Sequence, residues 1–172
     1  MEDKKYFSRQ IDESLMAWKN STRHKPLLLR GARQVGKSSS VRHLAKQFDY
    51  FVEINFERKP AYLEIFKGDR DAKHIVEMIK SITGEPIVPG KTLLFFDEIQ
   101  MCQEAISSLR FFWEDMPGLH VIAAGSLLEF ALSEIPTFGV GRIHSMFMYP
   151  MSFDEFLNAL GTVSYTHLTL PT

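Results

Sequence analysis

The chain has 172 residues, of which 45% are hydrophobic and 24% charged, with 20 Lys and Arg against 21 Asp and Glu. These are the proportions of a globular domain, and they exclude a disordered, fibrous or coiled-coil protein. The net charge of -1 gives no electrostatic reason to expect nucleic acid or an acidic membrane surface as the main partner.

Short apolar runs alternate with amphipathic segments along the chain. The spacing of Ile11, Leu15 and Trp18 predicts an N-terminal helical segment within residues 1–25. The predicted strands that follow are Leu27–Arg30, Tyr50–Phe56, Thr92–Asp97, His120–Gly125 and Ile143–Tyr149. The predicted helices between them are Lys37–Phe48, Ala72–Ile82, Gln103–Met116 and Leu127–Leu132. This alternation predicts an α/β fold, a parallel sheet of five strands with helices on both faces.

The end of the chain divides into a helix and an unusual tail. Ser152 and Glu155 have capping-box spacing after Pro150 and predict a helix through Leu160. The last ten residues, Val163–Thr172, match a translation of a transposase-type sequencing adapter residue for residue, although they would also suit a strand. We therefore expect a core over residues 26–161, an adapter-derived tail over 162–172, and a natural protein that continues past Gly161.

A phosphate-binding motif follows the first predicted strand. The segment Gly31–Ser38 reads G-x-x-x-x-G-K-S and opens the next predicted helix, which is the context that this motif requires. Its glycines let the backbone turn around a phosphate, Lys37 would reach the β- and γ-phosphates, and Ser38 would bind Mg²⁺. The alternative is a glycine-rich turn that holds no nucleotide. The predicted nucleotide-binding residues are Gly31, Ala32, Arg33, Gln34, Val35, Gly36, Lys37, Ser38 and Ser39.

Polar residues also end the third and fourth predicted strands. Asp97 would hold the water shell of Mg²⁺, and Glu98 would polarise the attacking water. The alternative is that this Asp-Glu pair only marks the point where a strand leaves the core for a solvated turn. Ser126 would lie beside the γ-phosphate as a sensor, or cap the following helix, or do both. Because no N-K-x-D guanine motif occurs, ATP is favoured over GTP.

Three features argue for a cytoplasmic protein without a membrane partner. The single cysteine, Cys102, excludes an internal disulfide and fits a reducing compartment. The opening residues, MEDKKYFSRQ, lack the apolar region of a secretory signal. The longest apolar stretch, Val121–Leu132, is interrupted by polar residues and glycine and cannot span a bilayer, which takes about 20 apolar residues.

A family resemblance rests on these segments: GARQVGKSS, LLFFDEIQ, VIAAGSLLEF, and VGR followed by YPMSFDEFL. Together they resemble the AAA-type ATPases of bacteria and archaea that are joined to a C-terminal domain of unknown function. The resemblance covers Gly31–Leu157 and implies an AAA+ core with strand order 5-1-4-3-2, ATP and Mg²⁺ as ligands, and Ser126 as sensor. It also implies that Arg142 acts near the γ-phosphate, in cis or across a subunit boundary of a homo-oligomer. The alternative is that Arg142, which lies just before a predicted strand, is a solvated or structural residue.

Three functions remain open from the sequence. The first is Mg²⁺-dependent ATP hydrolysis that drives or gates a C-terminal domain, which would bind a protein or nucleic acid. Its catalytic residues would be Glu98, Lys37, Ser126 and Arg142, and its metal ligands Ser38 and Asp97. The second is a nucleotide-gated binding switch with little turnover. The third, a small-molecule kinase, is disfavoured by Glu98, because such kinases take the nucleophile from the substrate.

Overall fold

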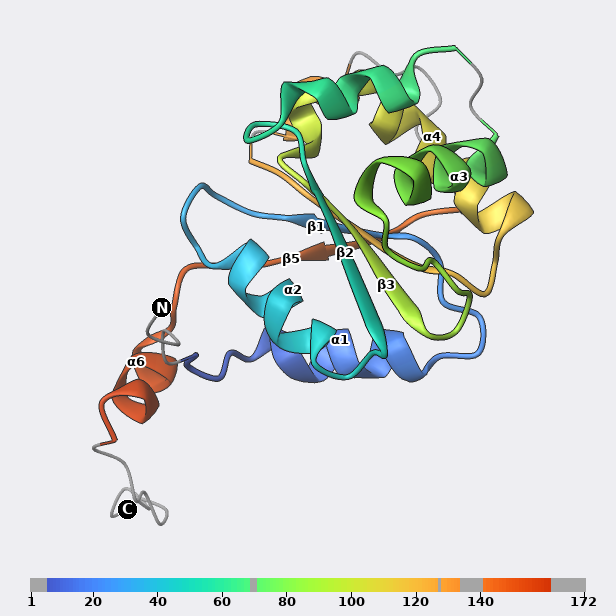
Figure 1. The fold of residues 1–172 in the computed structure, drawn as a ribbon. Helices are drawn as coiled ribbons and strands as arrows, with labels where there is room; N and C mark the ends of the chain where they lie inside the picture. The colour runs from blue at the N-terminus through green and yellow to red at the C-terminus, as the bar shows by residue number, and fades with distance from the viewer. Residues whose placement is uncertain (1–5, 69–70, 127, 134–140, 162–172) are drawn as a thin grey trace, which may run out of the picture.

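The computed structural model describes residues 6–68, 71–126, 128–133 and 141–161, so the predicted tail, 162–172, lies outside the described residues. The strands are β1 (Leu27–Arg30), β2 (Tyr50–Asn55), β3 (Thr92–Asp97), β4 (His120–Ala124) and β5 (His144–Phe147). The helices are α1 (Ile11–Asn20), α2 (Lys37–Ala45), α3 (Ala72–Thr83), α4 (Gln103–Asp115), α5 (Leu128–Ser133) and α6 (Phe153–Ala159), with 3₁₀ helices η1 (Pro60–Phe66) and η2 (Ile99–Met101) (Figure 1). Over the described ranges, no helix combines the length and apolar character needed to cross a membrane.

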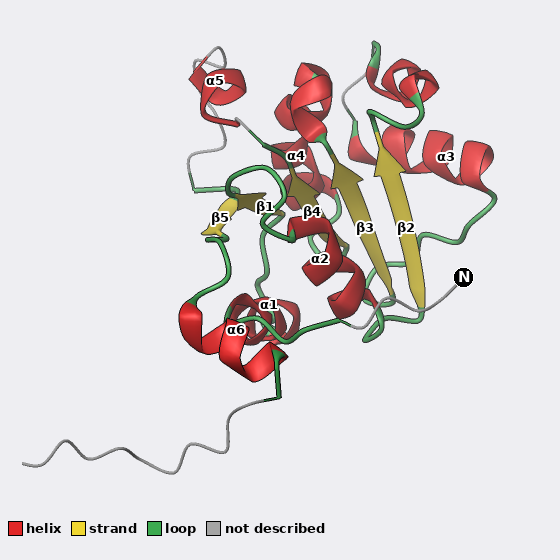
Figure 2. Cartoon of the chain, turned by 90° about the vertical axis from the view of Figure 1, so that its left-hand side faces the viewer, coloured by secondary structure: helices red, strands yellow, loops and turns green. Residues whose placement is uncertain are grey.

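The strands form one parallel sheet in the order β2-β3-β4-β1-β5. Read from the other edge, this is the predicted order 5-1-4-3-2, so the predicted α/β fold is confirmed. In the register of the sheet, Ala124 is level with Leu29 on one side and Asp97 on the other. The carboxyl ends of β1, β3 and β4 therefore open at one edge of the sheet, where ligands of parallel α/β folds bind (Figure 2).

The two faces of the sheet bury alternate residues against different helices. Leu94 and Phe96 of β3 pack in the core formed with α3 and α4, whereas Leu93 and Phe95 pack in the core formed with α1 and α2. Because strand side chains alternate between faces, a strand covered on both sides is apolar throughout. Trp18 of α1 is 5% exposed and belongs to the second core. The N-terminal helix is thus part of the same packed unit as the sheet.

Several element ends differ from the sequence prediction for local reasons. The helix predicted over Lys37–Phe48 ends at Ala45, because the next amides bond three residues back and tighten the chain into a 3₁₀-like turn. The strand predicted over Ile143–Tyr149 covers only His144–Phe147, because β1 offers four residues for pairing. The 3₁₀ helix Pro60–Phe66 was not predicted, since it is short and irregular in its spacing.

Two buried histidines pack together at the amino edge of the sheet. His24 and His120 are 7% and 9% exposed, and their ring centroids are 3.6 Å apart. His120 Nε2 lies 3.0 Å from the Lys19 carbonyl oxygen, and Trp18 packs edge-on at 5.4 Å between centroids. Burial lowers the pKa of His24, and it lowers the pKa of His120 to about 4. Both rings therefore fold in the neutral form.

This pair predicts a loss of stability in mild acid. Between about pH 6.5 and pH 4 the unfolded chain binds a proton at residue 120 that the folded chain does not, so the free energy of unfolding falls by up to about 1.4 kcal/mol per pH unit. We expect His120→Gln to reduce the difference in urea unfolding free energy between pH 7 and pH 5, measured by tryptophan fluorescence. The control, His74→Gln on the exposed face of α3, should keep the wild-type difference. Equal differences in all three proteins would contradict the prediction.

Candidate functional site

The loop between β1 and α2 owes its shape to two glycines. Gly31 has φ +142° and Gly36, which precedes α2, has φ +102°. A Cβ on Gly31 would lie 2.2 Å from the Met148 carbonyl oxygen, so the loop passes directly under the chain that leaves β5. Positive φ values cost little only for glycine, which explains the two glycines of the motif. The loop is thus held against β5 by a contact that leaves no room for a side chain.

Lys37 places a buried ammonium inside this loop. Its side chain is nearly buried, and Nζ donates hydrogen bonds to the carbonyl oxygens of Gly31 at 2.8 Å and Ala32 at 2.7 Å. Burial lowers the pKa of Lys37, while the carboxylates of Glu98 and Asp97 act in the opposite direction. A cation at the start of a helix, enclosed by turning backbone, is an arrangement that binds anions.

Asp97 meets Ser38 across the carboxyl edge. The Ser38 Oγ donates to Asp97 Oδ1 at 2.9 Å, and the Asn55 amide donates to Oδ2 at 3.0 Å. Arg42 lies 3.8 Å from Oδ2 and forms a second, closer pair with Glu53 at 2.6 Å. Burial raises the pKa of Asp97, and the hydrogen bond from Ser38 opposes that rise. The predicted metal ligands, Ser38 and Asp97, are therefore in direct contact.

Glu98 follows in a backbone conformation that is rare for its residue type. Its φ is +54°, and Gln100 Nε2 donates to its Oε2 at 2.6 Å. The other amide atom, Gln100 Oε1, would lie 2.2 Å from a Cβ on Gly125, so the glycine makes room for Gln100. Among the described residues, Gln34 at φ +63° and Glu98 are the only non-glycine residues with positive φ, and both lie at this edge. Such strain is concentrated at functional sites.

The two remaining predicted catalytic residues lie at opposite ends of the sheet. Ser126 follows β4 just beyond the level of Asp97, at the edge that carries the loop. Arg142 precedes β5 and therefore lies at the amino edge, where its Nε pairs with Glu114 Oε1 at 2.7 Å. The structure does not bring Arg142 to the loop, so a role in cis has no support. A role across a subunit boundary stays a prediction.

A hollow of about 540 Å³ opens beside the loop, on the side of the N-terminal segment. It brings together residues 6–9, the loop and the outer face of α2, and among its lining residues Tyr6 stacks on His43 with centroids 4.0 Å apart. Arg33, also a predicted binding residue, is exposed at the loop tip, 4.0 Å from Glu57. The lining residues are Tyr6, Phe7, Arg9, Gln34, Val35, Gly36, Ser39, Ser40, Arg42, His43, Lys46 and Met151.

Comparison with protein families agrees with this geometry. A family model described as an AAA domain matches residues 23–157, which include the loop, the acidic pair, Ser126 and Arg142. The chain belongs to the AAA domain family. AAA domains are nucleotide-binding, ATPase-type domains, and the parallel sheet with its loop at the carboxyl edge agrees with that membership. A comparison with curated proteins finds none that matches the chain.

Three residues that contact the candidate site escaped the sequence prediction. Asn55 ends β2 beside Asp97, Gln100 reaches back to Glu98, and Arg9 contacts the loop from the N-terminal segment. Asn55 carried a usable signal, because a polar residue at the end of a strand can meet the end of its neighbour. Arg9 carried none, since it reaches its partner across 26 positions of sequence.

The glycine contact predicts a large cost for one added methyl group. Gly31→Ala should lower the free energy of unfolding by at least about 2 kcal/mol, because it combines an unfavourable φ with overlap on the Met148 backbone. Gly118→Ala is the control, since its Cβ would meet only Pro89 Cβ at 3.4 Å, and it should change stability by less than about 0.5 kcal/mol. Thermal and urea unfolding would measure both, and equal stabilities would contradict the prediction.

Proposed function

We propose that this AAA domain binds ATP with Mg²⁺ and hydrolyses the bond between the β- and γ-phosphates. One observation carries the proposal: the Ser38 hydroxyl and the Asp97 carboxylate meet at 2.9 Å, next to a loop that encloses the Lys37 ammonium. Phosphate oxygens, a divalent cation and a water are the groups that such a set of donors and acceptors serves.

The triphosphate would take the place of the loop carbonyls as the partner of Lys37. In the structure Nζ already lies within the loop, at 2.8 Å and 2.7 Å from Gly31 and Ala32, so it needs little movement to meet a phosphate oxygen. The N-terminus of α2 and the loop amides add donors around it. The adjoining hollow would accept the nucleoside, with Tyr6 and His43 as its aromatic lining.

The residues present fit Mg²⁺, a hard cation that prefers oxygen ligands and keeps several waters. Ser38 and Asp97 supply such oxygens, and their mutual hydrogen bond shows that both point to the same place. Within the described ranges no group of three or more His, Cys, Asp or Glu side chains could hold a metal ion. When bound, Mg²⁺ would neutralise charge on the phosphates.

Glu98 is proposed to orient the attacking water. It lies next to Asp97 at the end of β3, and Gln100 fixes its carboxylate at 2.6 Å. Ser126 comes from the adjacent strand end and is proposed to contact the γ-phosphate or that water. Transfer to water rather than to a second substrate is what a carboxylate in this place supports.

A second candidate is a nucleotide-gated binding switch with little turnover. The hydrogen bond from Gln100 favours it, because a carboxylate engaged by an amide has one oxygen fewer to offer a water. The two functions share the binding site and differ only in what Glu98 does.

Two substitutions separate binding from hydrolysis. Lys37→Ala should abolish ATP binding measured by calorimetry, because it removes the only ammonium shown inside the loop of the described structure. Glu98→Gln should keep ATP affinity and slow phosphate release by at least about 100-fold, the loss typical for a general base. Chelation of Mg²⁺ should stop phosphate release by the wild type.

Glu77→Gln on the exposed face of α3 serves as the control for Glu98→Gln and should keep the wild-type rate. If Glu98→Gln keeps that rate while Lys37→Ala loses ATP, the hydrolytic role of Glu98 is wrong and the switch stands. ATP binding by Lys37→Ala with wild-type affinity would contradict both functions.

A further inference from the structure

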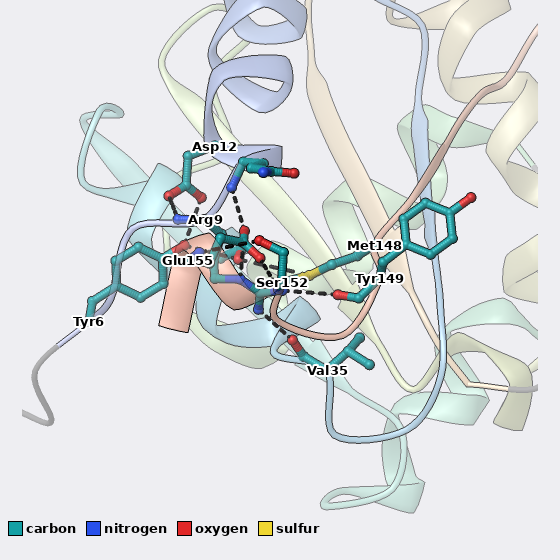
Figure 3. Close-up of polar contacts among 10 residues, drawn as sticks. Tyr6, Arg9, Asp12, Val35, Met148, Tyr149, Ser152 and Glu155 are labelled. Atoms are coloured by element: carbon teal, nitrogen blue, oxygen red, sulfur yellow. Dashed lines mark hydrogen bonds and ion pairs between the residues drawn. The ribbon is translucent and has the colours of Figure 1, made fainter. Parts of the chain in front are cut away.

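Arg9 is a buried cation with partners in three separate segments. Its side chain is 8% exposed. Nη1 donates to the Val35 carbonyl oxygen at 2.7 Å, Nη2 to the Tyr149 carbonyl oxygen at 2.9 Å, and Nε to Glu155 Oε1 at 3.1 Å (Figure 3). The guanidinium thus joins the phosphate loop, the chain after β5 and α6. A planar group with fixed donors holds each acceptor in a defined direction.

The contact with Val35 fixes the direction of a loop amide. In a planar trans peptide the C=O of one residue and the N–H of the next point to opposite sides. When Arg9 binds the Val35 carbonyl from outside the loop, the Gly36 N–H faces away from Arg9, toward the inside. Glycine leaves this peptide free to rotate, and Gly36 at φ +102° has no side chain to hold it. Arg9 supplies the restraint that glycine lacks.

Glu155 in turn holds Arg9. Its carboxylate accepts from the Gln10 amide at 2.7 Å through Oε1 and from the Ser152 amide at 2.7 Å through Oε2. Burial alone would raise the pKa of Glu155, but these hydrogen bonds and Arg9 bring it below the ordinary value. The acid is therefore ionised when it meets the guanidinium, as a buried ion pair with its remaining oxygens satisfied requires.

We propose that Arg9 is a positioning residue for phosphate binding: it turns the Val35–Gly36 peptide so that the Gly36 N–H faces the bound phosphate, and Glu155 of α6 keeps it in place. The inference rests on the proposed nucleotide site and adds a residue and a direction of coupling to it. Through Arg9, the chain after β5 acts on the orientation of an amide in the loop.

A merely structural role for Arg9 would have different consequences. If Arg9 only held α6 and the N-terminal segment to the domain, its loss would lower stability and leave the affinity of the folded protein for phosphates unchanged. If it contacted the nucleoside in the adjoining hollow, its loss would weaken ATP but not tripolyphosphate. Orientation of the Gly36 amide predicts equal weakening of both ligands.

The binding experiment uses the 172-residue chain with tripolyphosphate and ATP, each with Mg²⁺, in calorimetry. Arg9→Gln should weaken both ligands by a similar factor of about tenfold, the loss expected for one oriented hydrogen bond to an anion. Glu155→Gln should weaken both by a smaller factor. Arg23→Gln, on an exposed arginine before β1, is the matched control and should bind as the wild type does.

A spectroscopic readout reports the amide itself. The sequence has two Val-Gly pairs, Val35-Gly36 and Val140-Gly141, so carbonyl-labelled valine with ¹⁵N-glycine selects two amide signals. In the wild type, tripolyphosphate should shift the Gly36 signal downfield and leave Gly141 in place as an internal reference. In Arg9→Gln the Gly36 shift should be reduced or absent.

The outcomes separate the inference from the function on which it rests. If the wild type binds neither ligand, the proposed nucleotide site is wrong. If the wild type binds and Arg9→Gln keeps both its affinities and the Gly36 shift, the role of Arg9 is overturned. Should Arg9→Gln fail to fold, Arg9→Lys and Glu155→Gln replace it, and a full wild-type Gly36 shift in both overturns the inference.

Discussion

The 2.9 Å hydrogen bond between Ser38 and Asp97 joins the start of α2 to the end of β3, across 59 positions of sequence. It exists because β1 and β3 run in the same direction on either side of β4. Their carboxyl ends then meet at one edge with a single strand between them. If either strand ran in the other direction, the loop and the acidic pair would lie at opposite ends of the sheet. The candidate site thus depends on strand direction before it depends on any side chain.

Compensation among charges is the second constraint on this edge. A buried ammonium and a buried carboxylate are both costly unless each finds partners. Lys37 is satisfied by loop carbonyls, and Asp97 by a hydroxyl and an amide, so neither needs the other directly. Under the proposed function, a phosphate would therefore compete with partners that are already in place. The affinity for phosphate would then be the difference between its contacts with the site and the contacts that it replaces. Small changes in loop geometry would therefore change that affinity.

Elements were predicted correctly from the sequence where a local residue pattern marks them. The strands Leu27–Arg30 and Thr92–Asp97 were predicted with their observed bounds, because buried parallel strands are continuous apolar runs. The capping box of α6 was also confirmed, since its residues are three positions apart. Arg9 was missed because its partners are set by tertiary contacts. Gln100 was missed although Glu98 is only two positions away, because the positive φ of Glu98 that accompanies this contact is not evident from the sequence. The resemblance implies a role for Arg142 near the γ-phosphate, in cis or across a subunit boundary. Strand direction places Arg142 at the amino edge of its own sheet, so only the role across a subunit boundary stays a prediction.

The capping box of α6 does more than start a helix. Glu155 uses Oε2 for the Ser152 amide, which closes the box, and Oε1 for Arg9 and Gln10. One carboxylate is thus both the helix cap and the counterion of the guanidinium. If the first turn of α6 frays, both contacts are lost in the same event. The first turn of α6 and the contacts that hold Arg9 therefore form one cooperative unit for local unfolding. They should open and close together rather than independently.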